Sequence, residues 1–308
     1  MAEIRDVARN IFLIDDKLYS VPGAGCVYFL AEEKKALIDT GPATSAGVVL
    51  DGIQRIGFKS SDVDYIVITH IHLDHAGGAG TLLKHMPRAK VVVHYKGMSH
   101  LIDPSRLILS AKAAQGKDTF ERNGEVLPIP EHKLIPAYDG DKIKLSREQI
   151  LTLIDAPGHA PHELCIYESR NKGIFVGDAV GHYIEGIDIM IPVTPPPSFD
   201  LDLYLRTLDR LLKLKASRIY FSHAGTSTQV QEKLEAAISK LKARNDLIAK
   251  AAAEDKLDTA AEIVVSHICA ELQSIKQRMP PVYDSWANND IPMSAAEHVR
   301  YYRKKHGF

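Results

Sequence analysis

The sequence predicts a mixed α/β (α+β) fold, followed by a helical extension. Short segments rich in β-branched and aromatic residues precede amphipathic segments, and this order of strands before helices occurs twice before residue 225. From residue 226 onward, apolar residues recur at spacings of three and four, which is the pattern of helices. We therefore expect one α/β domain over residues 1–225 and a helical C-terminal extension or cap over residues 226–308.

The first half of the chain alternates predicted strands with predicted helices. Turns rich in glycine, proline or charge separate three short strands, and an amphipathic helix follows them, with Gly57 as its expected end. The expected strands cover residues 10–14, 26–30, 35–38, 64–68 and 90–94, and the expected helices cover residues 44–56, 81–86 and 104–115. Between residues 117 and 141 prolines break any periodicity, and so long an irregular segment is often a functional loop or a lid.

The second half of the chain repeats this order. Strands are expected over residues 149–154, 163–167 and 173–176, and helices over residues 201–214, 230–252, 260–275 and 294–305. Ser198 is the expected N-cap of the helix that begins near residue 201. The proline-rich segment before it, residues 191–198, is expected to be extended, either as a stiff wall beside a pocket or as a rigid connector.

Four potential metal ligands lie in one short stretch, His70-Ile71-His72-Leu73-Asp74-His75. The stretch follows a predicted strand and precedes a predicted helix, and Gly77 and Gly78 allow a tight turn there. Imidazole and carboxylate groups together suit zinc, iron or manganese. Packing does not require so many polar side chains in one strand-to-helix loop, so we interpret the stretch as a metal site.

The composition is that of an ordinary globular protein without a dominant charge. Of 308 residues, 45% are hydrophobic and 25% charged, and the formal net charge is −1, so no global field attracts nucleic acid or an acidic membrane. Cys26, Cys165 and Cys269 show no paired spacing, which favours reduced thiols. The first residues lack the apolar segment of a signal peptide, and no apolar run reaches the roughly 18 residues of a membrane span. We expect a cytoplasmic protein that acts on a small molecule.

The metal-binding stretch and four further motifs resemble those of the metallo-β-lactamase superfamily. The further motifs, in family order, are Leu37-Ile38-Asp39-Thr40-Gly41, Asp155-Ala156-Pro157-Gly158-His159, Phe175-Val176-Gly177-Asp178 and Tyr220-Phe221-Ser222-His223-Ala224-Gly225. The resemblance implies an αββα four-layer sandwich of two mixed sheets with outer helices. It also implies a hydrolase, and the glyoxalase-II-like branch is the leading comparison.

By the same resemblance, seven side chains would hold two divalent metal ions, with zinc favoured and iron or manganese compatible. One ion would be bound by His70, His72 and His159, the second by Asp74, His75 and His223, and Asp178 would bridge them. The two ions would generate a bridging hydroxide at neutral pH, which attacks an ester, thioester or lactone. Asp74 would also orient this nucleophile, and Asp39 would hold a ligand imidazole in place, so both are candidate catalytic residues.

Four other residues are candidates for substrate binding. His182 and Tyr183 come shortly after Asp178, and a pocket tyrosine donates a hydrogen bond to the substrate in some relatives. Arg300 and Lys304 belong to a basic cluster in the last predicted helix, and such clusters bind the anionic part of the substrate in some glyoxalase-II-like relatives. A solvated helix face remains the alternative for the basic cluster, and a packed core position the alternative for Tyr183.

Several reactions remain open at this stage. Glyoxalase II usually has a third histidine where Ile71 stands and a Cys-Gly-Arg-like stretch after the bridging aspartate, so glutathione is not an expected ligand. A lactonase, whose chemistry is closely related, is one alternative. A mononuclear iron oxidoreductase similar to persulfide dioxygenases keeps the same histidines, and a metal-dependent phosphodiesterase or nuclease is a further alternative. The apolar stripes of the C-terminal helices could cap the site or form a homodimer interface.

Overall fold

Two large mixed sheets form the centre of the molecule, which we describe from a computed structural model of residues 3–223 and 225–308. The expectations that include Met1, Ala2 and Ala224 therefore lie outside the described residues at those positions. The first sheet has the order β1 (Ile4–Ala8), β2 (Ile11–Asp15), β3 (Cys26–Ala31), β4 (Lys35–Ile38), β5 (Val63–Val67), β6 (Lys90–His94) and β7 (Leu134–Ala137). Strands β1 to β4 pair in antiparallel register, and β4 to β7 pair in parallel.

The second sheet is also mixed. Its order is β15 (Gly225–Ser227), β14 (Arg218–Phe221), β11 (Gly173–Phe175), β10 (Leu164–Glu168), β9 (Ile150–Asp155) and β8 (Lys142–Lys144). Only β11 and β14 run parallel to each other. A separate hairpin of β12 (His182–Ile184) and β13 (Ile189–Ile191) follows β11 in the chain.

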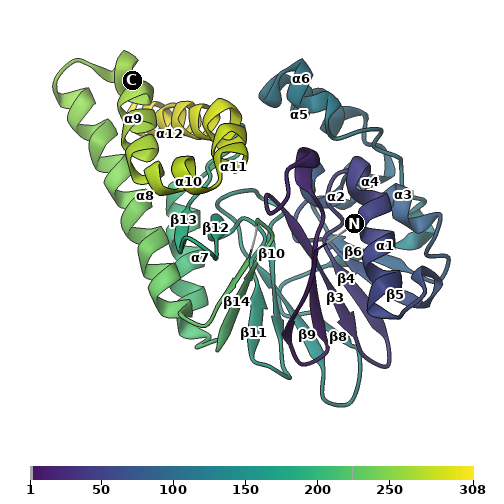
Figure 1. The fold of residues 1–308 in the computed structure, drawn as a ribbon. Coiled ribbons are helices and arrows are strands. Elements are labelled where there is room, and N and C mark those ends of the chain that lie inside the picture. The colour runs from purple at the N-terminus through teal and green to yellow at the C-terminus, as the bar shows by residue number, and fades with distance from the viewer. Residues whose placement is uncertain (1–2, 224) are drawn as a thin grey trace.

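The two sheets stack face to face and carry helices on their outer faces, which confirms the predicted αββα sandwich (Figure 1). Alternation along β3 shows the principle: Tyr28 and Leu30 point between the sheets, while Val27 and Phe29 pack against the outer helices. The outer helices of the first half are α1 (Ala46–Ile56), α3 (Ala79–Leu83) and α4 (Met98–Ile102). Helices α7 (Leu201–Lys213) and α8 (Val230–Ala253) cover the second sheet.

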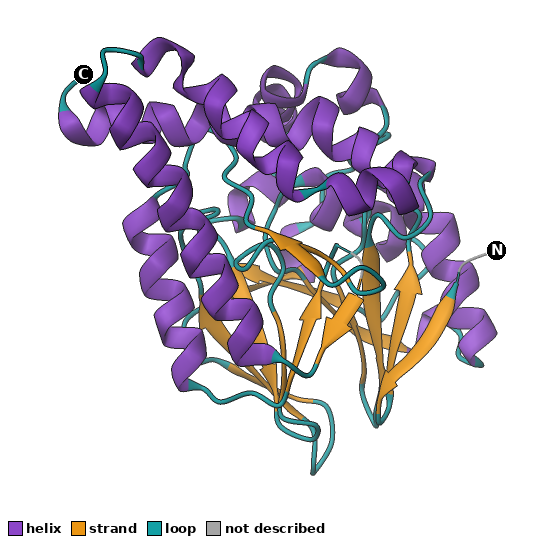
Figure 2. Cartoon of the chain, turned by 60° about the vertical axis from the view of Figure 1, so that its left-hand side comes forward, coloured by secondary structure: helices purple, strands orange, loops and turns teal. Residues whose placement is uncertain are grey.

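The C-terminal helices have an apolar core of their own. They are α9 (Ala260–Glu271), α10 (Gln273–Arg278), α11 (Pro280–Ser285), a π-helical turn over Trp286–Asp290 and α12 (Ile291–His306). Ile248 of α8, Ile268 of α9 and Trp286 are buried together there. Figure 2 shows this group above one end of the strands, while α5 (Ser105–Gln115) and α6 (Lys117–Glu121) stand across from it in Figure 1.

Three local expectations are corrected by the structure. The segment 117–141, expected to be a loop or lid, contains α6 and the edge strand β7, whose pairing with β6 no local pattern reveals. Asp200, not Ser198, caps α7, because its carboxylate accepts a hydrogen bond from Leu203 N at 2.9 Å. The expected helix 260–275 is interrupted at Leu272, so that α9 and α10 are separate.

Within residues 3–223 and 225–308, no helix has both the length and the apolar composition needed to cross a membrane.

Candidate metal centre

The centre lies where several strands end at the same edge of the sandwich. Asp39 follows β4, the histidine-rich stretch follows β5, Asp178 follows β11 and His223 follows β14. Because β4 and β5 are parallel, as are β11 and β14, their carboxyl ends meet at one edge, which is where open α/β sheets bind ligands. The short helix α2 (Leu73–Ala76) then turns Asp74 and His75 toward the strand ends.

Two glycines allow the backbone to approach this closely. Gly158, directly before His159, has φ +140°, and a Cβ there would lie 2.3 Å from Tyr204 Cα. Gly177, directly before Asp178, has φ +49°, and a Cβ there would lie 2.4 Å from a carboxylate oxygen of Glu163. Any side chain at either position would push the following ligand residue out of place.

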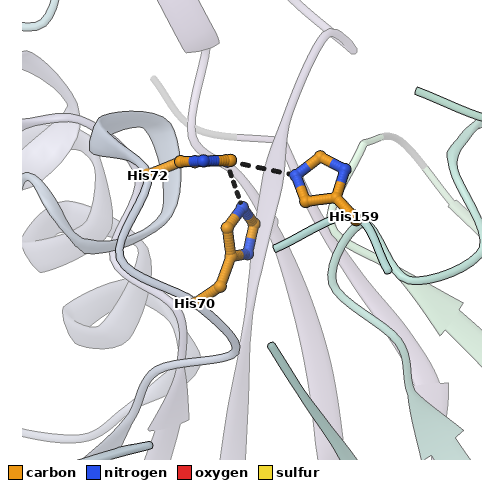
Figure 3. Close-up of side chains that lie close together, drawn as sticks. All are labelled: His70, His72 and His159. Atoms are coloured by element: carbon orange, nitrogen blue, oxygen red, sulfur yellow. Dashed lines mark hydrogen bonds between the residues drawn. The ribbon is translucent and has the colours of Figure 1, made fainter. Parts of the chain in front are cut away.

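Three imidazoles converge on one point (Figure 3). His70 Nε2 lies 2.8 Å and His159 Nε2 3.1 Å from His72 Nδ1, so the three nitrogens face a common centre. A tetrahedral zinc ion at about 2.0–2.1 Å from each nitrogen separates its ligands by about 3.3 Å. The three side chains therefore already have nearly the spacing that one metal ion requires.

A second group shares this edge of the sheets. Asp74, His75 and His223 form it, with His75 Nε2 3.2 Å from His223 Nε2 and Asp74 Oδ2 3.5 Å from His223 Nε2. Asp178 lies between the two groups. Its Oδ1 is 3.5 Å from both His75 Nε2 and His223 Nε2, while its Oδ2 is 3.6 Å from His159 Nε2.

The outward-facing nitrogens of the imidazoles also have partners. Asp39 Oδ2 lies 3.0 Å from His75 Nδ1, and the same carboxylate accepts hydrogen bonds from Thr69 and Ser222. Backbone carbonyls accept hydrogen bonds from His159 and His223. Val193 O lies 3.1 Å from His159 Nδ1, and Ala24 O lies 3.1 Å from His223 Nδ1. Such partners fix the tautomer and the ring orientation, so that the opposite nitrogen is the atom that could bind a metal ion.

Burial keeps most of the histidines neutral. Desolvation lowers the pKa of His70 and His72, that of His159 to about 3 and that of His223 to about 4. Neutral imidazoles present the lone pairs that metal binding requires.

The carboxylates of Asp74 and Asp178, in contrast, favour a positive charge beside them. Burial would lower the pKa of His75, but Asp178 and Asp74 raise it well above its usual value. Asp178 Oδ1 is buried and has no hydrogen-bond partner among the described residues. A cation at this point would satisfy that oxygen and balance both carboxylates, so the residues fit a divalent metal.

One buried residue of the centre was not anticipated from the sequence. Glu163, directly before β10, is fully buried. Its Oε2 lies 3.3 Å from His70 Nδ1, and its other carboxylate oxygen accepts a hydrogen bond from Asp178 N at 3.1 Å. Glu163 thus contacts both His70 of the first group and Asp178, which lies between the groups. An acidic residue at the head of an otherwise apolar strand was the signal that could have found it.

A cavity of about 720 Å³ opens onto the centre. Its floor includes His72, Asp74 and Asp178, while residues 195–198 and one face of α5 form walls. The C-terminal helices supply the roof, including Trp286, Asp290, Met293 and Arg300.

Of the four candidate substrate-binding residues, two line the cavity and two do not. His182 lines the cavity, with its Nε2 3.6 Å from Asp178 Oδ2. Its neighbour Tyr183 points to the opposite side of β12, donates to Asp188 Oδ1 at 2.8 Å, and does not line the cavity. Arg300 lines the cavity, but its guanidinium is occupied by Glu297 and Pro197 O. Lys304 is exposed and does not line it.

The fold and the centre define an αββα sandwich with a histidine- and aspartate-rich metal site at one edge. The chain belongs to the metallo-beta-lactamase superfamily, whose family model matches residues 21–223.

Two similar proteins show how far the sequence similarity extends. The metallo-beta-lactamase fold-containing protein ST1585 of Sulfurisphaera tokodaii is 30% identical over 225 residues, which cover 71% of this chain and 80% of that protein. Its crystal structure superposes with a TM-score of 0.65 and 27% identity, covering 76% of this chain and 86% of that chain. An N-acyl homoserine lactonase of Bacillus cereus is 25% identical over 242 residues, covering 70% of this chain and 86% of the lactonase.

A further solved structure extends the match in fold into the C-terminal helices. The metallo-beta-lactamase family protein TTHA1429 of Thermus thermophilus superposes with a TM-score of 0.68 and 21% identity. The match covers 98% of this chain and 95% of that chain, so the similarity in fold includes the helical extension.

Proposed function

We propose that this protein is a dinuclear metal-dependent hydrolase that cleaves an ester, thioester or lactone bond of a small molecule. The observation that carries the proposal is the position of Asp178, whose two oxygens face different ligand groups. A carboxylate so placed is suited to bridge two ions, and pairs of ions typically serve hydrolytic reactions.

In this proposal, seven side chains hold the ions. His70, His72 and His159 hold one, Asp74, His75 and His223 hold the other, and Asp178 contacts both. When bound, such ions lower the pKa of a coordinated water toward about 7 and polarise the oxygen of the bond to be cleaved. Zinc is favoured because neutral imidazoles dominate the ligand set, and iron and manganese accept the same ligands.

The chain itself contributes orientation. Asp74 is both a member of the second group and a cavity-lining residue, so its carboxylate can hold the attacking water toward the substrate. Asp39 keeps the His75 ring in place through Nδ1, at 3.0 Å.

The cavity supports a small-molecule substrate. Its volume of about 720 Å³ is within the range of small-ligand pockets, and alanine, proline, leucine and methionine side chains form much of its lining. The similarity to N-acyl homoserine lactonases supports a lactone or ester in particular.

In this proposal residues 1–225 are the catalytic domain and residues 226–308 are the helical extension, in which α8 covers the second sheet and residues 285–300 cap the cavity. Trp286, Asp290 and Met293 line the cavity, which favours the cap over a surface used only for homodimer formation. A cytoplasmic location is part of the proposal, and the unpaired spacing of the three cysteines supports it.

Metal analysis combined with an activity screen tests the proposal. The purified protein should carry two equivalents of zinc and hydrolyse members of a panel of lactones, esters and thioesters. His159→Ala should lose metal and activity, whereas His132→Ala, an exposed histidine far from the centre, should retain both. One equivalent of iron, with oxygen consumed on a persulfide and no hydrolysis, would instead establish the oxidoreductase alternative.

A further inference from the structure

Three consecutive residues form a strap between the metal centre and the C-terminal helices. The strap consists of residues 192–194, directly after β13. Each of its residues is held by a different element: Pro192 O accepts from Arg244 of α8, Val193 O from His159, and Thr194 is bonded to Ser294 of α12. The strap therefore connects a metal-ligand imidazole with two helices that follow the last ligand in the chain.

The hydrogen bond from Arg244 to Pro192 O is made by a guanidinium that is almost fully buried. The Arg244 side chain is only 1% exposed, and its Nη1 donates to Pro192 O at 2.6 Å. Its Nε and Nη2 have no hydrogen-bond partner among the described residues. Burying a guanidinium with so few partners costs free energy, so stability alone does not account for an arginine here. A charge-assisted hydrogen bond is, however, an effective way to fix a carbonyl group.

The contact with Ser294 is a two-point attachment. Thr194 Oγ1 donates to Ser294 O at 2.7 Å, and Thr194 N donates to Ser294 Oγ at 3.1 Å. Both side chains are buried, with exposures of 1% and 3%. Two parallel hydrogen bonds between the same residues fix position and orientation together, so α12 determines where the strap runs.

Between these two attachments lies the carbonyl that accepts from His159. Val193 O, 3.1 Å from His159 Nδ1, keeps the proton on that nitrogen and leaves Nε2 free to face His72. Movement of the strap would tilt the imidazole away from the other two ligands. We propose that Arg244 and Ser294 are positioning residues for His159, which act through the strap to set the zinc affinity of the group His70, His72 and His159.

This role differs from roofing the cavity. It links the helical extension to metal binding itself and does not depend on which bond the enzyme cleaves. Failure of the inference would leave the proposed hydrolase function intact, because wild-type metal content and activity are measured separately.

The test titrates metal-free protein with Zn²⁺ in competition with a chromophoric chelator. Thr194→Val and Ser294→Ala should each weaken one zinc equivalent about 10-fold, in line with the loss of a partner that orients a ligand, and change the other less than 2-fold. The weakened equivalent should be the one that His159→Ala loses. Thr194→Ser, which keeps the hydroxyl, should restore wild-type affinity.

A matched control removes a polar contact of the same helices away from the strap. Arg303 of α12 forms an ion pair with Asp258, directly before α9, so Arg303→Met perturbs the helical extension without touching the strap or Arg244. The control should keep both zinc affinities. Equal weakening in the control, or unchanged affinity in both Thr194→Val and Ser294→Ala, would overturn the inference. Arg244→Met tests the other attachment, and if it does not fold, the two variants at the Thr194–Ser294 contact decide the question.

Discussion

Asp178 Oδ2 lies 3.6 Å from His159 Nε2, although the two residues come from different loops and face each other across the centre. The other oxygen of Asp178 faces His75 and His223. One carboxylate thus contacts both ligand groups, and the metal content of the protein should depend on it more than on any single histidine.

Replacing Asp178 with alanine should lower zinc content and hydrolysis together, because the variant removes the group that, in our proposal, both ions share. We expect less than one equivalent of zinc after dialysis and a loss of kcat of at least about 100-fold. Elemental analysis and steady-state kinetics on the same preparation provide the measurement. A variant that kept two equivalents of zinc and full activity would contradict the bridging role.

Recognition of an anionic substrate should depend on Arg106 more than on Arg300 or Lys304. Arg106 lines the cavity and forms no ion pair within the part of the chain that the structure describes, whereas Arg300 is paired with Glu297. Arg106→Ala should raise KM for anionic esters about 5-fold and leave kcat nearly unchanged, as loss of uniform binding does. Lys304→Ala is the control and should leave KM unchanged. A neutral ester should respond to neither change.

Asp188 should stabilise the protein at neutral pH and lose this effect in acid. It accepts hydrogen bonds from Lys233 Nζ at 2.7 Å and Tyr183 OH at 2.8 Å, and the bond from Lys233 lowers the pKa of Asp188. Because the folded state has the lower pKa, the stabilisation is complete above the unfolded value of about 4 and disappears as the pH falls through the folded value.

Asp188→Asn should therefore reduce the free energy of unfolding by about 1 kcal/mol at pH 7, with a smaller difference from wild type toward pH 3. Urea denaturation across this pH range measures it. Asp246→Asn, at an exposed position of α8, is the control and should cost little at any pH. A difference at Asp188 that grew on acidification would have the wrong sign.

Nucleic acid should bind weakly. The net charge of −1 gives no overall attraction for phosphates, so filter binding to single-stranded RNA should give dissociation constants of roughly 10⁻⁴–10⁻⁶ M with a strong salt dependence. Nanomolar affinity with metal-dependent cleavage would support the nuclease alternative instead.

Much of the fold was predictable because its signals are local. The expected strand 90–94 coincides with β6, and the expected helix 230–252 differs from α8 by one residue. Strand β7 was missed because an edge strand with two exposed residues owes its structure to pairing with β6, which lies about forty residues earlier in the chain. The cap at Asp200 was missed by two residues, since several polar residues there could cap a helix and only the backbone path selects one.

By itself, the sequence determined the class of the protein and the set of seven side chains that the structure brings to one edge of the sheets. It could do so because the motifs that carry these side chains come shortly after strands, and the ends of neighbouring parallel strands meet at one edge of a sheet. Only the tertiary structure decided which polar groups serve the ligands and which do not. Arg300 is paired with Glu297, Tyr183 with Asp188, and His159 with the strap that Arg244 and Ser294 hold, and each of these depends on how separate elements pack together. No spacing along the chain encodes such contacts, because they join residues that become neighbours only when the helical extension folds over the sandwich.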